Sequence, residues 1–284
     1  IFVTRRAVAG EVARSLLRNE TRITTPENLD GVLGILSVLI KEGQTTPAGP
    51  AGRSRIPPET DESVEEQGWL ARIIHLIRAP DNIAQSALLR KAQIAFAEGD
   101  SRTKYTTPAL MTASLKLARS LKRREHLSND DYAAESSRLW KFMHTTLSSL
   151  YTRVPAPGVP DLCLRLFVSC GQVAAQCGAQ DAGYEFFAQA FTIYEESISD
   201  SRSQFQAICV ISGALCGVGV GGGKEEGGEA QGGFGREEYD TLITKAALHG
   251  SKLLKKPDQC RGVYLASHLW WGVEKAERGE GGRE

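Results

Sequence analysis

The sequence predicts an all-α protein, an α-solenoid of HEAT-like antiparallel helix pairs, and three observations support this fold class. Apolar residues recur at positions i, i+3, i+4 and i+7, which is the spacing of an amphipathic helix. No segment shows the sustained period-two alternation with β-branched residues that is typical of a strand. Short and longer connections alternate, which groups the helices into pairs of about 40 residues, the period of HEAT-like repeats. Each pair leaves one apolar face uncovered, so neighbouring pairs are expected to stack.

The clearest helix is expected over residues 26–42. Leu29 and Leu36 belong to its apolar stripe. Thr25 can accept a hydrogen bond from the free amides of the first turn, and Pro26 occupies a position where a missing N–H costs nothing. This segment therefore carries both a start signal and a buried face.

The other helices repeat this stripe and are bounded by proline or by capping residues. Pro80 ends one helix and starts the next, Thr106–Pro108 repeats the Thr-Thr-Pro helix start, and Pro257 stops the helix before it. Ser201 and Gln204 have the spacing of a capping box. The eleven expected helices span about 7–20, 26–42, 63–78, 80–98, 107–125, 130–152, 160–177, 180–199, 201–216, 236–255 and 258–272.

Two segments interrupt the helical pattern. Gly43–Glu62 is rich in Pro, Gly, Thr and Glu and is expected to be a flexible surface loop. Gly217–Gly235 contains ten glycines and is expected to be largely disordered. Because the helical pattern resumes after each segment, we expect residues 1–284 to form one α-solenoid fragment with two loops.

Composition excludes several classes of protein. The 284 residues contain 34 Lys and Arg and 34 Asp and Glu, and this balance argues against a nucleic-acid-binding protein. Six cysteines are too few for a disulfide scaffold, so reduced thiols in a cytoplasmic protein are expected. The first residues lack the apolar region of a signal peptide, and the chain starts without Met, as expected of a piece of a longer protein. The longest uncharged stretch, Gln204–Gly223, has about the length of a membrane span. Its second half is mostly glycine, so no transmembrane helix is expected there.

The candidate catalytic motifs do not fit their chemistry. Gly217–Gly222 matches a dinucleotide-binding fingerprint as text, but a helix rather than a strand precedes it. Cys163, Cys170 and Cys177 lie seven residues apart, about 10 Å along a helix, which is too far for two ligands of one zinc ion. Buried cysteines are the better interpretation. The sequence therefore predicts no catalytic residue, cofactor or metal site, and the chain is not expected to be an enzyme.

Three clusters of charged or aromatic residues remain. Each charged cluster is either a solvated face or a contact surface, and for the last two lysines the simple explanation is complementation of a helix C-terminus. The aromatic cluster lies on one helix face at i, i+4 and i+7, either as core packing around a hydrogen-bonded histidine or as a surface for a partner. The acidic cluster is Glu195 and Glu196 with Asp200 nearby, the basic cluster is Lys245, Lys252, Lys255 and Lys256, and the aromatic cluster is Tyr264, His268 and Trp271.

The most specific segments of the chain are SKLLKKPDQCRGVYLASHLWW at Ser251–Trp271 and AGYEFFAQAFTIYEESISDS at Ala182–Ser201. Both resemble the large subunit of retromer, the vacuolar-protein-sorting coat of endosomes. RIIHLIRAPDNIAQSALLRKAQIAF at Arg72–Phe96 and TPENLDGVLGILSVLIKEG at Thr25–Gly43 resemble the same family in the same order. Gly217–Gly235 departs from the family pattern as an insertion, which we expect in a fungal member.

The resemblance implies the C-terminal half of that subunit, an α-solenoid that lacks its last repeats. The expected function is that of a scaffold of the retromer coat in cargo retrieval from endosomes to the Golgi and the plasma membrane. The family's C-terminal half binds a small subunit with a metallophosphoesterase fold on its concave face and self-associates through its distal end. An arrestin-like subunit binds the absent N-terminal half, sorting nexins act indirectly, and a Rab GTPase-activating protein is a further expected partner. The implied location is cytoplasmic and peripheral on endosomal membranes.

The resemblance also implies two sets of site residues. His268, with its neighbours Tyr264 and Trp271, matches a position linked to small-subunit binding. The implied self-association residues are Glu195, Glu196, Lys252, Lys255 and Lys256. Ser197 stands where relatives often carry another acid, which would weaken that contact. The alternative is a HEAT-like scaffold of another trafficking coat or adaptor complex, and the Ser251–Trp271 segment argues against it.

Overall fold

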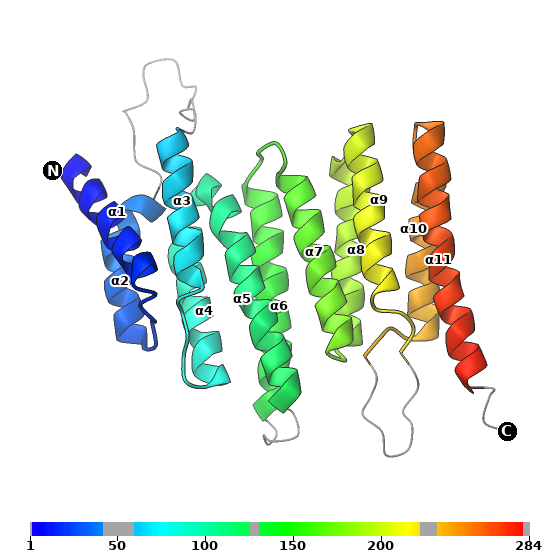
Figure 1. Ribbon diagram of the computed structural model, residues 1–284, viewed down its shortest axis with the longest axis horizontal. Helices are drawn as coiled ribbons and strands as arrows, with labels where there is room; N and C mark the ends of the chain where they lie inside the picture. The colour runs from blue at the N-terminus through cyan, green and yellow to red at the C-terminus, as the bar shows by residue number, and fades with distance from the viewer. Residues whose placement is uncertain (1, 42–59, 125–130, 222–231, 281–284) are drawn as a thin grey trace. The chain divides into compact units, whose positions relative to one another are not determined.

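The computed structural model describes residues 2–41, 60–124, 131–221 and 232–280 (Figure 1). This part of the chain contains eleven α-helices and one short 3-10 helix, with two isolated bridges in place of strands. The predicted all-α class and its helix pairs are therefore confirmed. The elements are α1 (Phe2–Arg18), α2 (Pro26–Ile40), α3 (Asp61–Ile74), α4 (Asn82–Ala97), η1 (Asp100–Arg102), α5 (Thr103–Arg124), α6 (Asp131–Arg153), α7 (Val159–Gln176), α8 (Gln180–Ser197), α9 (Ser201–Cys216), α10 (Arg236–Ser251) and α11 (Lys256–Glu280).

The contacts divide the chain into two compact units, Ile1–Ala156 and Pro157–Glu284. Within each unit a helix packs against its neighbour in sequence and against the next helix but one. In the first unit α3 contacts α1 and α5, while α4 contacts α2 and α6. In the second unit α9 contacts α7 and α11. This pattern is the one that stacked helix hairpins produce.

The second unit carries the predicted site residues, and two glycine contacts set its helix spacing. A Cβ on Gly171 of α7 would lie 2.8 Å from the Phe187 ring of α8, so only glycine allows this approach. Gly250 of α10 and Gly262 of α11 face each other in the same way, since a Cβ on Gly250 would lie 3.2 Å from the Gly262 backbone. Close backbone approach at these glycines holds each hairpin tightly together.

The glycine-rich segment is anchored where the structure describes it. Residues 222–231 lie outside the described residues, so the predicted disorder of Gly217–Gly235 stays a prediction there. On either side, Val220 forms a bridge with Phe234, and the Gly221 amide donates to the Phe234 carbonyl at 2.9 Å. Phe234 is fully buried and packs edge-on against Phe187 at a centroid distance of 5.7 Å. The segment thus returns a core side chain to the α7–α8 pair.

The other predicted loop, Gly43–Glu62, lies mostly outside the described residues. Its last residues are helical, because Thr60 caps α3 through its side chain and the helix begins at Asp61.

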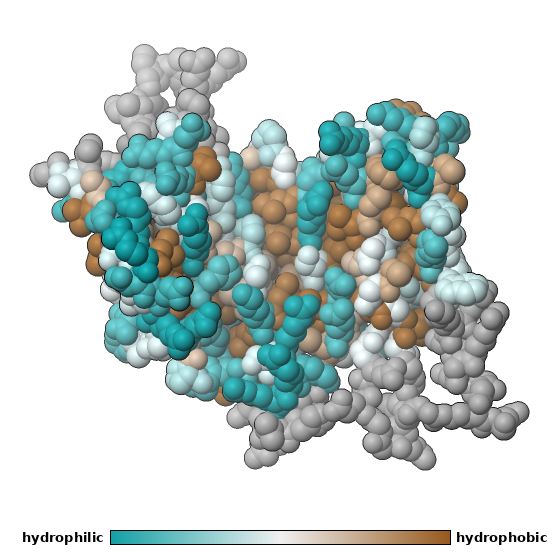
Figure 2. All heavy atoms as spheres, viewed as in Figure 1, coloured by the Kyte–Doolittle hydropathy of each residue, from teal (hydrophilic) through white to brown (hydrophobic). Residues whose placement is uncertain are grey.

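At the protein surface, apolar side chains are exposed in the part of the second unit where α9 and α11 lie (Figure 2).

Several predicted helix boundaries are wrong. The first helix begins at Phe2 rather than near residue 7, α3 ends at Ile74 rather than near 78, and α11 continues beyond residue 272 to Glu280. Three other ends are wrong for a local reason. Pro108 lies inside α5 rather than at its start, because η1 leads directly into a helix that begins at Thr103. Asp200, not Ser201, caps α9, and its carboxylate accepts from the Ser203 amide at 2.9 Å. The helix expected to continue to residue 255 ends at Ser251.

Candidate interaction surfaces

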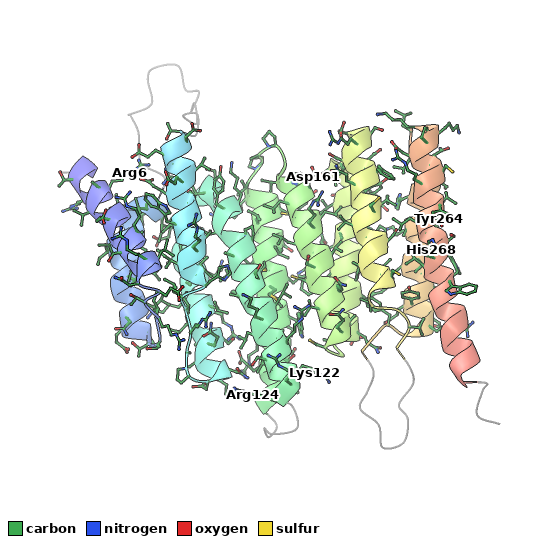
Figure 3. The ribbon with its side chains drawn as sticks, viewed as in Figure 1. Arg6, Lys122, Arg124, Asp161, Tyr264 and His268 are labelled. Carbon is green, nitrogen blue, oxygen red and sulfur yellow. The ribbon has the colours of Figure 1, made fainter. Side chains whose placement is uncertain are left out.

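The aromatic residues of α11 lie on its outer face. Tyr264 is 68% exposed, Trp271 is 56% exposed and His268 is exposed beside them. The rings of Tyr264 and His268 meet edge to face at 4.9 Å, on successive turns of the helix (Figure 3). Ala266 and Leu269 supply the buried side of the same helix. The interpretation as core packing is therefore wrong, and these three side chains form an exposed aromatic surface, called the α11 aromatic face below.

Glu195 is held within its own chain. One carboxylate oxygen lies 3.0 Å from the ammonium of Lys245 and 3.0 Å from Nε2 of His249, both on α10. The Lys245 ammonium also lies over the Phe191 ring at 5.1 Å, a cation–π distance. The hydrogen bond from Lys245 lowers the pKa of Glu195. Glu195 thus links α8 to α10.

His249 completes this link from the other side. Its ring stacks on Phe191 and meets Tyr194 edge-on, with centroid distances of 5.8 and 4.8 Å. Burial lowers the pKa of His249, and the Glu195 carboxylate acts in the opposite direction. Sequence reasoning missed the pairing of Glu195 with His249 because 54 residues separate them. No spacing rule relates two such positions on different helices.

The remaining acidic and basic residues are exposed. Glu196 has no ion-pair partner among the described residues, and the same holds for Lys252 and Lys255. Lys256 donates to the side chain of Gln259 at 3.1 Å within its own helix. Of the five residues predicted for self-association, four are therefore available to a second molecule, and Glu195 is already paired.

Lys255 and Lys256 do not complement a helix C-terminus, so that part of the sequence analysis is wrong. The Lys255 carbonyl accepts from the Gln259 amide as α11 begins, and Lys256 is its first residue. The amino end of a helix carries a partial positive charge, which disfavours lysine by about 0.3–1 kcal/mol per residue at an exposed site. Local helix electrostatics thus do not account for this pair of lysines.

The acidic and basic residues lie at the same end of the second unit. The connection from α8 to α9 and the connection from α10 to α11 point the same way (Figure 1). The charge of Lys255 contributes to the lowered pKa of Asp200, which the hydrogen bond from the Ser203 amide chiefly causes. We call Glu196, Lys252, Lys255 and Lys256 the charged end. It places both signs of charge at one end of the unit.

The structure supplies the surroundings of the cysteines. Cys163 and Cys170 are fully buried, as predicted, whereas Cys177 is partly exposed. Burial raises the pKa of the Cys163 thiol to about 12 and also raises that of Cys170.

In the described part of the chain, no three or more His, Cys, Asp or Glu side chains are grouped so that they could hold a metal ion. No helix in this part is long and apolar enough to cross a membrane.

Comparison with known proteins finds a family model that matches almost the whole chain. The family model described as vacuolar protein sorting-associated protein 35 matches residues 2–283. Vacuolar protein sorting-associated protein 35A of Arabidopsis thaliana is 33% identical over 270 residues, which cover 94% of this chain and 31% of that protein. Vacuolar protein sorting-associated protein 35 of Schizosaccharomyces pombe is 37% identical over 216 residues, which cover 76% of this chain and 24% of that protein. The matched residues thus span 31% and 24% of the length of these two relatives.

Proposed function

The chain belongs to the family of vacuolar protein sorting-associated protein 35, and from this premise we propose that it is a scaffold segment of a retromer coat. The scaffold makes and breaks no covalent bond; it holds partner proteins at fixed positions along stacked helix pairs. The observation that carries the proposal is the exposure of the α11 aromatic face, which lies within the residues that the family model matches.

The α11 aromatic face is proposed to bind the small subunit with a metallophosphoesterase fold. Exposed aromatic rings on a rigid helix supply apolar contact area at little cost in conformational entropy, which is typical of binding hot spots. Tyr264 orients His268 through their edge-to-face contact. Trp270 and Val263, which are also partly exposed, extend the apolar area.

The charged end is proposed to mediate self-association. A two-fold contact pairs the same patch with itself, so a patch with adjacent acidic and basic residues can be complementary to its own copy. Glu196 of one molecule would pair with the lysines of the other. Glu195 supports this contact indirectly, because it fixes the end of α8 against α10.

The remaining partners and the location are also proposed, on the ground of membership in the family. The chain would act peripherally on endosomal membranes, together with an arrestin-like subunit, sorting nexins and a Rab GTPase-activating protein. Their contact residues are not assigned to this chain.

Calorimetric titration of the chain with the small subunit tests the binding face. Tyr264→Ala and His268→Arg are expected to weaken binding by about 30-fold or more, the effect of losing a hot-spot residue. Ile94→Ala is the matched control, because Ile94 is 67% exposed on α4 in the other unit. Unchanged affinity in variants that keep the wild-type circular dichroism spectrum and melting temperature would refute the assignment.

A further inference from the structure

The first unit contains a cavity that the scaffold function does not use. It has a volume of about 290 Å³ and lies between the carboxyl end of α3, the connection to α4, and α5. This volume is close to the lower end of small-ligand pockets, roughly 300 Å³. Ile74, Ile77 and Leu117 supply its apolar lining. Its polar lining includes three basic residues, His75, Arg78 and Lys116.

The wall that carries Arg78 is held in place by the protein itself. The Ile23 amide donates to the Leu76 carbonyl, and the Arg78 amide donates to the Ile23 carbonyl, both at 2.9 Å. The Gln85 side chain holds the same segment from α4, since its Nε2 donates to the Ile77 carbonyl at 2.9 Å and its Oε1 accepts from the Ala79 amide at 2.6 Å. The segment is thus preorganised, so a ligand would not have to order it on binding.

Arg78 and Lys116 have no ion-pair partner in the part of the chain that the structure describes. Both are among the basic residues that line the cavity, and neither contributes to the ion pairs that link other helices of the described chain. Burial lowers the pKa of His75, and the nearby charges of Lys116 and Arg78 lower it further. The one carboxylate in the lining, Asp81, accepts from the Ala84 amide as the cap of α4.

Uncharged donors complete the lining. Ser120 donates its hydroxyl proton to Oδ1 of Asn82 at 3.3 Å, so this oxygen orients the amide group. The Nδ2 protons of Asn82 have no acceptor among the described residues. A phosphate group can be bound jointly by a guanidinium, an ammonium and an amide. The guanidinium of Arg contacts two phosphate oxygens at once, and the ammonium of Lys acts as a point charge.

We propose that this cavity binds a phosphate monoester, with Arg78 and Lys116 contacting the phosphate and Asn82 donating to it. The bound group is either the phosphate of a small soluble molecule or that of a lipid headgroup. The site uses residues of the first unit alone and is independent of the partner surfaces proposed above, all of which lie in the second unit.

Glycerol 3-phosphate is the soluble probe, titrated into the full chain by calorimetry at constant ionic strength. Vesicles that contain phosphatidic acid are the lipid probe, with phosphatidylserine vesicles of equal charge density as their comparison. Saturable binding of glycerol 3-phosphate is expected, and sulfate should compete whereas acetate should not. If the phosphatidic acid vesicles also bind better than the phosphatidylserine vesicles, the lipid headgroup is a ligand; if they do not, the ligand is soluble.

The double variant Arg78→Ala with Lys116→Ala is expected to weaken binding by about tenfold or more, since each residue makes a charge-assisted contact. The control Lys141→Ala with Arg165→Ala removes the same charge from exposed positions outside the cavity and should bind like the wild type. Lys116→Met, which keeps the aliphatic stem on an exposed helical position, gives the same test should the double variant unfold. Absence of saturable binding, equal loss in the control, or equal competition by acetate would overturn the proposal.

Discussion

Reversing the charge of two lysines should remove self-association while the fold stays intact. In Lys255→Glu with Lys256→Glu, two positive charges at the amino end of α11 become negative. Each reversal removes an unfavourable interaction with the helix dipole and adds a favourable one, each worth about 0.3–1 kcal/mol. The variant also loses the exposed hydrogen bond to Gln259 and gains repulsion from Asp258, which is in the first turn. It replaces the attraction between Lys255 and Asp200 by repulsion, and these changes offset part of the gain. The net expectation is a stability gain of about 0.5–1 kcal/mol.

The same variant should lose self-association, because Lys252 is then the one positive residue of the charged end and the other three positions are negative. Thermal unfolding followed by circular dichroism should show a melting temperature up to about 3 °C above that of the wild type. Sedimentation velocity at increasing concentration should show dimers for the wild type and monomers for the variant, while the small subunit still binds both. A melting temperature several degrees lower would refute the account of α11, and an unchanged dimer fraction would refute the role of the charged end.

Three further predictions concern stability. Phe234→Ala should lower the free energy of unfolding, measured by urea titration, by about 3–5 kcal/mol, because it empties a fully buried site. Phe234→Leu should cost less. A Phe234→Ala variant as stable as the wild type would contradict the packing of this side chain. Gly171→Ala should destabilise the protein by about 1–3 kcal/mol, because its methyl group would clash with Phe187. Gly213→Ala has open space around it and should stabilise the protein by up to about 1 kcal/mol. Similar effects of the two variants would contradict the close approach of α7 and α8. His75 and His249 have lowered pKa values, so the unfolded chain binds protons more readily than the folded chain. The free energy of unfolding should therefore fall as the pH is lowered from about 7 to 5.5, and replacing both with Gln should flatten this slope.

The helices could be predicted from sequence because each has its own apolar stripe and local end signals. Thr25 and Pro26 act on their own helix, and the structure confirms both the cap and the helix start. Thr106–Pro108 shows where local signals fail, since η1 and the tertiary contacts of Arg102, which donates to the Leu39 and Lys41 carbonyls, start the helix earlier. Phe234 also escaped prediction, because a single phenylalanine in a glycine-rich segment shows no periodicity.

The site could be predicted in part. Spacing placed Tyr264, His268 and Trp271 on one face, but only the fold decides whether that face is buried or exposed. The charged residues were found from composition along the chain, whereas the pairing of Glu195 with Lys245 and His249 depends on how α8 meets α10. The cavity around Arg78 gave no sequence signal, because α3, α4 and α5 each contribute isolated polar residues to it.

Hydrogen–deuterium exchange of the chain with and without the small subunit tests the central proposal most directly. The account predicts slower exchange in the part of α11 that carries Tyr264, His268 and Trp271, with the charged end unchanged when dimers are absent. Unchanged exchange along α11 in a saturated complex, or protection confined to the first unit, would contradict it.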